Sequence, residues 1–117
     1  MTDIYDQHST TFKSVSAYVV ALNGERVATI AFKFPKDGAG RLTVYAHWLG
    51  VSMVKGTATG YGYDKCSAAL ANASRKITGE SSDIDAQAKF VSAIAHDCGS
   101  NWDAELRRAG FDVLQAV

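Results

Sequence analysis

Alternation of apolar and polar residues runs through the first half of the chain and predicts a series of β-strands. The segments 12–22 and 25–35 both show this pattern, and the dipeptide Asn23-Gly24 separates them. Asn-Gly is the strongest short-range signal for a two-residue hairpin, because a type I′ turn requires positive φ at both central residues. The two segments are therefore predicted to form an antiparallel hairpin.

A hairpin in which Leu22 pairs with Glu25 divides the side chains of its strands between two faces of the sheet. The predicted core face is wholly apolar and carries Val15, Ala17, Val19, Ala21, Ala28, Ile30, Phe32 and Phe34. The predicted opposite face is mixed, as expected where one side of a sheet lies near water. It carries Ser16, Tyr18, Val20, Thr29, Ala31 and Lys33.

The next segments predict a third strand and a weaker fourth strand. In segment 41–49 one face is apolar, with Leu42, Val44, Ala46 and Trp48. The other face of this strand carries Arg41, Thr43, Tyr45 and His47. Segment 51–58 is less regular and predicts an edge strand, whereas the β-branched tail 111–117 predicts a last strand that returns to the sheet.

Apolar residues recur at helical spacing in the second half of the chain. A first helix is predicted to begin near Asp64 and to stop at Thr78-Gly79. Its predicted buried residues are Cys66, Ala69, Leu70, Ala73 and Ile77. A second helix follows Ser82, which forms a capping-box pattern with Asp85. Its predicted buried stripe consists of Ile84, Ala88, Val91 and Ala95, broadened by Phe90 and Ile94.

A short third helix is predicted between Ser100 and Gly110, which gives the order of four strands, three helices and a final strand. Runs of strands followed by runs of helices indicate an α+β fold, here an antiparallel sheet of four to five strands with helices packed on one face. One domain is predicted to span residues 1–117. Residues 1–11 lack periodicity and are predicted to be a loosely attached terminus.

The composition narrows the range of partners and the expected location. Among 117 residues, 12 Lys and Arg balance 12 Asp and Glu, so the formal net charge is +0. This balance argues against an acidic mimic of DNA and against binding driven by bulk positive charge. No apolar run is long enough to span a bilayer, and the polar N-terminus is unlike a signal peptide. Cys66 and Cys98 fall in helical patterns, so a reduced cytoplasmic protein without membrane contact is predicted.

The glycine-rich stretch TATGYGYDKCSAAL, residues 57–70, raises the question of a phosphate-binding loop. The dinucleotide fingerprint GxGxxG fails because Lys65 stands where the third glycine is needed, and the context is not a βαβ unit. The GxxxxGK[ST] pattern fails as well. Asp64 is placed to cap the following helix, so the stretch is interpreted as a corner between the two halves of the chain. Tyr61, Tyr63 and Lys65 are retained as corner residues that a partner could contact.

A second candidate surface is the mixed face of the predicted sheet. Tyr18, Lys33, Tyr45 and His47 are predicted to point the same way from three strands. Aromatic and basic residues on a sheet face are the means by which RNA-recognition domains stack bases, but the strand at 40–47 does not match their signature. An ordinary solvated face is the alternative interpretation. If the face binds a partner, a protein is favoured over nucleic acid because the net charge is zero.

No motif predicts an enzyme, a metal site or a cofactor. The histidines and cysteines lack the spacing of a structural zinc site. His96 and Cys98 lie about 200° apart on a helix, so they cannot bind one ion together. Neither cysteine is accompanied by a recognisable base, and both are interpreted as small buried residues. The chain is therefore predicted to be non-enzymatic, with no catalytic, metal-binding or cofactor-binding residue.

The stretches PKDGAGRLTVYAHWLG, GYGYDKCSAALANA and NWDAELRRAGFDVLQAV resemble small proteins carried by phages, prophages and plasmids of Gram-negative bacteria. Some proteins of this kind are anti-CRISPR or other anti-defence factors. The resemblance implies a small protein of the host cytoplasm that binds and inhibits a nucleoprotein or nuclease subunit of a bacterial defence complex. The alternative is a weak single-stranded nucleic-acid-binding accessory protein. Edge strands such as 51–58 or 111–117 could also pair with a second copy to form a homodimer.

Overall fold

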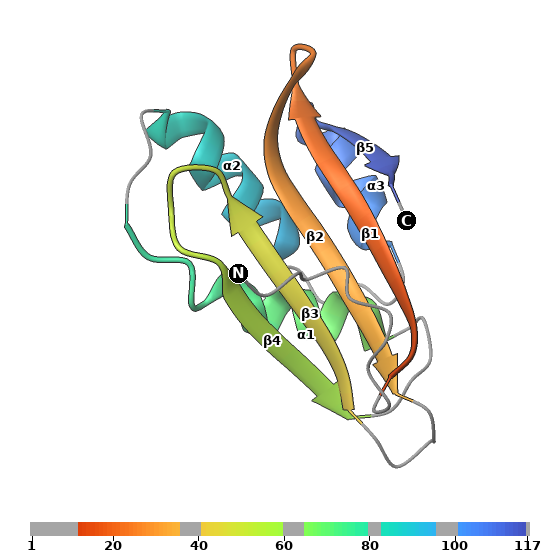
Figure 1. Cartoon of the computed structure of the whole chain (residues 1–117). Coiled ribbons are helices and arrows are strands. Elements are labelled where there is room, and N and C mark those ends of the chain that lie inside the picture. The colour runs from red at the N-terminus through yellow and green to blue at the C-terminus, as the bar shows by residue number, and fades with distance from the viewer. Residues whose placement is uncertain (1–11, 36–40, 60–64, 80–82, 96–100, 117) are drawn as a thin grey trace.

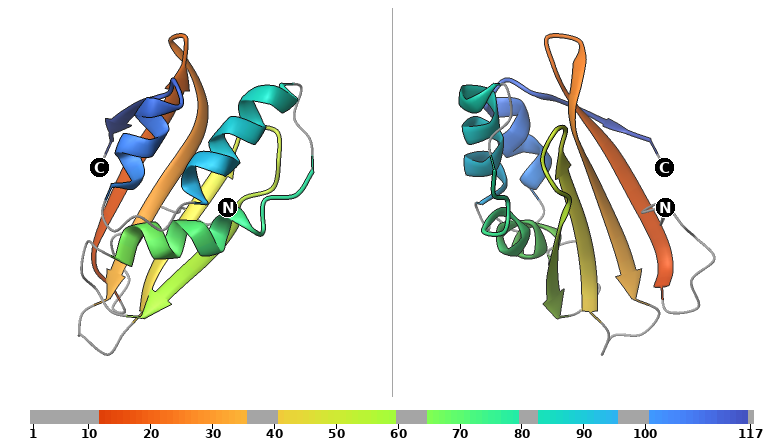
Figure 2. Two further views of the ribbon diagram at one scale, coloured as in Figure 1. Left: turned by 180° about the vertical axis from the view of Figure 1, so that it is seen from behind. Right: turned by 60° about the vertical axis from the view of Figure 1, so that its left-hand side comes forward.

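A computed structural model describes residues 12–35, 41–59, 65–79, 83–95 and 101–116 and confirms the α+β class. The described part contains one antiparallel sheet and three helices, which all pack on the same face of the sheet (Figures 1 and 2). The strands are β1 (Phe12–Leu22), β2 (Glu25–Pro35), β3 (Arg41–Trp48), β4 (Val54–Thr59) and β5 (Asp112–Gln115). The helices are α1 (Cys66–Ser74), α2 (Ile84–Ile94) and α3 (Trp102–Arg108).

The strands follow the order β4-β3-β2-β1-β5 across the sheet. The first four strands form a meander, and the C-terminal strand β5 returns to pair with β1, as predicted. The hairpin between β1 and β2 turns at Asn23 and Gly24, whose φ angles of 54° and 84° confirm the predicted turn. The edge position predicted for β4 is also confirmed.

The register of the β1–β2 hairpin differs from the prediction by one residue over most of its length. Ala21 pairs with Arg26, but the next pair is Val20 with Ala28, so Val27 has no partner of its own. This β-bulge moves every residue of β1 before Ala21 to the other face of the sheet. The predicted division of β1 was therefore wrong: Val20, not Val19, lies on the helix-covered face.

The helix-covered face of the sheet forms the core. Large apolar side chains of β2 and β3, including Ile30, Phe32 and Val44, are fully buried there with Leu70 of α1 and Phe90 of α2. Removing each such side chain from water contributes about 2 kcal/mol to the free energy of unfolding. The core therefore fixes all three helices against one face of the sheet.

Helix α1 lies unusually close to the edge strand β4. A Cβ atom at Gly56 would stand 2.2 Å from the backbone oxygen of Ala69 and 2.5 Å from the backbone nitrogen of Ala73. Such distances are far inside van der Waals contact, so the approach requires glycine at this position. The glycine brings the helix backbone directly against the strand.

Helix α2 buries a different stripe from the predicted one. Its buried residues are Ala86, Gln87, Phe90, Ala93 and Ile94, so the predicted broadening residues Phe90 and Ile94 are confirmed. Val91 of the predicted stripe is half-buried against the core, whereas the placement of the other three residues was wrong, because Ile84 is 54% exposed and Ala88 and Ala95 are also exposed. The Phe90 ring determines which side of α2 faces the core. It packs against Trp48 and Phe111, with ring centroids 5.3 and 6.2 Å away.

The ends of helices α1 and α2 differ in part from the predicted ones. Asp83 caps α2 by accepting a hydrogen bond of 3.1 Å from the backbone N–H of Ala86, whereas the predicted cap Ser82 lies outside the described residues. Helix α1 begins after Lys65 and ends at Ser74, earlier than predicted; Asp64 lies outside the described residues. In the described ranges, no helix is long and apolar enough to cross a membrane.

Candidate functional site

The sheet face opposite the three helices is the candidate binding surface, and we call it the open face (Figure 2). No helix or strand of the described part covers it. The strand registers place the following residues on it: Ala17, Val19, Thr29, Ala31, Lys33, Arg41, Thr43, Tyr45, His47, Lys55, Thr57, Asp112 and Leu114. Its central residues Ala17, Thr29, Ala31, Lys33 and Thr43 are themselves buried, whereas Arg41, Lys55 and Leu114 towards its margins are exposed.

Tyr45 occupies the centre of the open face on β3. It pairs with Ala31 of β2 on one side and with Lys55 of β4 on the other. The small side chain of Ala31 leaves room for the tyrosine ring. The Nζ atom of Lys33 lies 5.3 Å from the ring centroid of Tyr45, a cation–π arrangement that holds an amphipathic lysine flat on the sheet. Tyr45 and its lysine neighbours thus form one connected cluster.

A second feature of the open face is a row of side chains that crosses four strands. Leu114 pairs with Val19, Val19 with Thr29, and Thr29 with His47, so one line runs from β5 to β3. Leu114 is 60% exposed, although it is a large apolar residue in a regular strand. Val19 and His47 are half-buried. The row therefore offers an apolar end at β5 and an aromatic, basic end beside Tyr45.

Three of the four residues predicted for the mixed face lie on it together, namely Lys33, Tyr45 and His47. Tyr18 does not: the β-bulge places it on the helix-covered face, where its ring meets Trp102 edge-on at 4.9 Å and Phe32 at 6.1 Å. The prediction that Tyr18 shares a surface with Tyr45 was therefore wrong.

Of the three predicted corner residues, the structure describes Lys65. Tyr61 and Tyr63 lie outside the described residues. Lys65 is exposed at the start of α1, and its side chain makes no capping hydrogen bond. Sequence reasoning missed Leu114, because a strand of four residues gives too short an alternation to tell its two faces apart.

Both outer strands of the sheet carry side-chain hydrogen bonds on their backbone oxygens. On β4, Asn72 Nδ2 donates to the oxygen of Thr57 and Lys76 Nζ donates to the oxygen of Lys55, each at 2.7 Å. On β5, Arg107 Nη2 donates to the oxygen of Val113 at 3.2 Å. Native proteins protect sheet edges with charged side chains in this way, which limits pairing with further strands.

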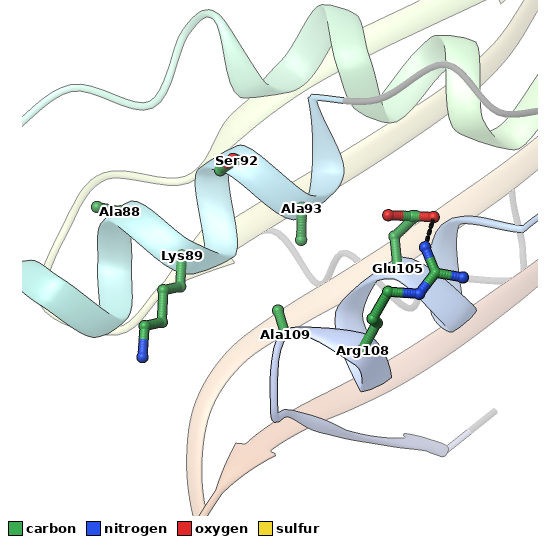
Figure 3. Close-up of a pocket in the computed structure, with 7 residues that line it drawn as sticks. All are labelled: Ala88, Lys89, Ser92, Ala93, Glu105, Arg108 and Ala109. Atoms are coloured by element: carbon green, nitrogen blue, oxygen red, sulfur yellow. Dashed lines mark hydrogen bonds and ion pairs between the residues drawn. The ribbon is translucent and has the colours of Figure 1, made fainter.

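A groove of about 480 Å³ lies between α2 and α3 on the far side of the molecule from the open face (Figure 3). Its lining consists of Ala88, Lys89, Ser92, Ala93, Glu105, Arg108 and Ala109. Glu105 accepts a hydrogen bond from Arg108, so its carboxylate is already matched by a positive charge. Among the described residues that line the groove, there is no histidine beside the Ser92 hydroxyl to activate it as a nucleophile.

The described residues contain no group of three or more His, Cys, Asp or Glu side chains that could hold a metal ion. Cys66 is a buried free thiol, and Cys98 lies outside the described residues. Comparisons with protein families, with curated proteins and with solved structures find no match to this chain. The case for a function therefore rests on the surface of the described residues and on the sequence stretches quoted above.

Proposed function

We propose that this chain is a non-enzymatic binding protein that contacts a protein partner through the open face and thereby inhibits a bacterial defence complex. The observation that carries the proposal is the row from Leu114 to His47, with Tyr45 beside it. Energetically important residues of protein interfaces are enriched in aromatic side chains and lie near the centre of the contact. The open face provides such a centre.

Hydrogen bonds at the two sheet edges favour the open face, rather than an edge strand, as the contact surface. Backbone oxygens of both outer strands already accept hydrogen bonds from Asn72, Lys76 and Arg107. A partner strand at either edge would have to displace these donors. The homodimer through an edge strand is for this reason the less favoured mode of assembly.

The class of target comes from the sequence. The stretches at 35–50, 60–73 and 101–117 resemble small proteins of phages and plasmids of Gram-negative bacteria, some of which act against host defence. A protein of this kind acts in the host cytoplasm on a nucleoprotein or a nuclease subunit. The proposal combines this target class with the binding surface on the sheet.

A second candidate, single-stranded nucleic acid, is favoured by the basic side chains around Tyr45. Stacking of bases on aromatic rings normally supplies much of the affinity in such proteins. One face of the Tyr45 ring is covered by the Nζ end of Lys33, which limits that contribution. The protein partner is therefore the first choice.

The chain offers a matched pair of variants for the test. Leu114 on the open face and Ile84 on α2 are 60% and 54% exposed, so Leu114→Asp and Ile84→Asp each place a charge on an already exposed position. Each variant is expressed in a Gram-negative host whose CRISPR system blocks a test phage. Phage plating and co-purification of named subunits of that CRISPR complex are then measured.

The unchanged chain and Ile84→Asp are expected to restore plating and to retain the subunits, whereas Leu114→Asp loses both. Circular dichroism confirms that the two variants are equally folded. The proposal fails if the unchanged chain neither restores plating nor retains a defence subunit. The choice of surface fails if Ile84→Asp, and not Leu114→Asp, removes the activity.

A further inference from the structure

We infer that residues 1–11 fold back over the centre of the open face, so that a protein partner has to displace them to bind there. The competition with a partner rests on the proposed function, whereas the covering of the face stands apart from it. Residues 1–11 lie outside the described ranges, and their position is inferred from the described residues that they would cover.

The centre of the open face is buried, although none of the described helices or strands lies over it. Ala17 and Ala31 have 0% of their surface exposed, and Lys33 has 7%. A lysine on a sheet face normally keeps its ammonium in water. The neighbours Ala31 and Thr43 are too small to enclose the Lys33 side chain, and the Tyr45 ring meets its Nζ from one side. A further part of the chain therefore has to lie over this centre.

Residues 1–11 have the attachment point and the reach for this position. They precede Phe12, where β1 begins beside Pro35 of β2. Eleven extended residues span about 36 Å, whereas Thr29, at the far end of the buried centre, lies about 20 Å along β2 from Pro35. The segment can therefore run over the whole buried centre from its attachment to β1.

The other segments outside the described ranges fit this position less well. Residues 36–40 join the ends of β2 and β3, and such a connection extends over about 20 Å. A path from Pro35 out to Ala31 and back to Arg41 is about 26 Å long, so this connection is too short. The remaining internal segments each adjoin a helix on the other face, namely 60–64, 80–82 and 96–100. Residue 117 alone is too small to cover three strands.

The composition of residues 1–11 suits the buried centre. The segment reads MTDIYDQHSTT and contains neither lysine nor arginine. Its carboxylates Asp3 and Asp6 flank the apolar pair Ile4 and Tyr5. The apolar pair can pack on the alanines of β1 and β2 and exclude water from them. One of the two carboxylates can then neutralise the ammonium of Lys33.

Lys33 needs a counter-charge because a buried ammonium is unfavourable unless it is paired. Lys33 has an interaction partner besides the Tyr45 ring. The described carboxylates of the sheet are too distant to be that partner: Glu25 lies about 26 Å away along β2, and Asp112 lies at the same end of the sheet. The other described carboxylates belong to α2 and α3 or their caps, on the other face. The counter-charge is thus expected from residues 1–11.

Acetylation of lysines tests the covering of the face. The protein is treated briefly with the N-hydroxysuccinimide ester of acetic acid, and mass spectrometry measures the rate at Lys33 and at Lys89, which is exposed on α2. One variant lacks residues 2–11. A second variant keeps the full chain and carries Asp3→Asn with Asp6→Asn. The matched control is Asp37→Asn, in the connection that follows β2.

In the unchanged chain, Lys33 is expected to react about tenfold more slowly than Lys89, because its side chain is covered. The deletion should raise the rate at Lys33 at least about fivefold and leave Lys89 unchanged. The double Asn variant should raise it about threefold, and Asp37→Asn should not. Circular dichroism verifies that each variant is folded.

Two results would overturn the covering of the face: Lys33 reacting as fast as Lys89 in the unchanged chain, or Lys33 staying protected in the folded deletion variant. If the deletion exposes Lys33 but the double Asn variant does not, the covering stands and the assigned counter-charge is wrong. The same holds if Asp37→Asn, and not the double variant, raises the rate at Lys33.

The competition with a partner is measured separately. Biolayer interferometry compares the unchanged chain and the deletion variant on the purified defence subunit that the unchanged chain retains. The deletion variant is expected to bind about tenfold more tightly, since no segment has to be displaced. Weaker binding of the deletion variant would exclude competition. If the unchanged chain neither restores phage plating nor retains a subunit, the proposed function fails, and acetylation alone decides whether residues 1–11 cover the face.

Discussion

The two faces of this sheet are formed by the same strands but differ in the side chains that they carry. The helix-covered face carries Ile30, Phe32, Val44 and Trp48, which are buried among the apolar side chains of three helices. The open face carries alanine, threonine, cations and one tyrosine at the neighbouring positions. Stability is concentrated on the first face. The exposed positions of the second face, such as Arg41, Lys55 and Leu114, can therefore change their side chains at little cost to the fold.

The contact between α1 and β4 should show the largest effect on the helix-covered side. In Gly56→Ala, the new Cβ would lie 2.2 Å from the backbone oxygen of Ala69, so the helix must move away from the strand. We expect a loss of about 3 kcal/mol in the free energy of unfolding, the upper end of the range for overpacked sites. Urea denaturation measures this change.

Gly50→Ala is the control for that substitution. Gly50 has a φ of 88°, and a Cβ there would meet nothing within 4 Å. Its cost is limited to backbone strain of about 1 kcal/mol. Equal losses for Gly56→Ala and Gly50→Ala would show that close packing of α1 on β4 is not what requires glycine at position 56.

Two adjacent valines on β1 compare the faces directly and should show smaller effects. Val20 is fully buried on the helix-covered face, whereas Val19 is half-buried on the open face. Val20→Ala should lower the free energy of unfolding by about 2 kcal/mol, because it removes two buried methyl groups and leaves a cavity. Val19→Ala should lower it by at most about 1 kcal/mol, within the range of strand preferences.

The same urea series distinguishes two registers of the hairpin. A hairpin without the bulge at Val27 would place Val19 in the core and Val20 on the open face. Val19→Ala would then lower the free energy of unfolding more than Val20→Ala does. In that register Tyr18 would not lie beside Trp102.

Much of the fold was predictable because its signals are local. The Asn23-Gly24 turn, the alternation in β3 and the return of β5 all follow from short stretches of sequence. The bulge was not predictable, because β1 and β2 have apolar or small residues at enough positions on both faces to tolerate either register. Only the packing of Tyr18 and Val20 against α3 and the sheet distinguishes them.

The stripe of α2 shows a second limit of prediction. Ile84, Ala88, Val91 and Ala95 fit helical spacing as well as the buried residues do. Which stripe of α2 is buried depends on Phe90, because its ring packs against Trp48 and Phe111. Local spacing does not reveal these contacts, since both partners are distant in sequence.

The candidate site was predictable in part. Lys33, Tyr45 and His47 follow from strand alternation in β2 and β3, which the structure confirms. Tyr18 was misplaced because its face depends on the bulge, and Leu114 was missed because β5 is short.

The division between a stabilising face and a binding face is tested most directly by site-specific photocrosslinking in the phage-infected host. The photoreactive amino acid p-benzoylphenylalanine is placed at position 47 on the open face or at position 92 on the exposed side of α2. The account predicts a covalent adduct with a subunit of the defence complex from position 47 and none from position 92. An adduct from position 92 alone would contradict it.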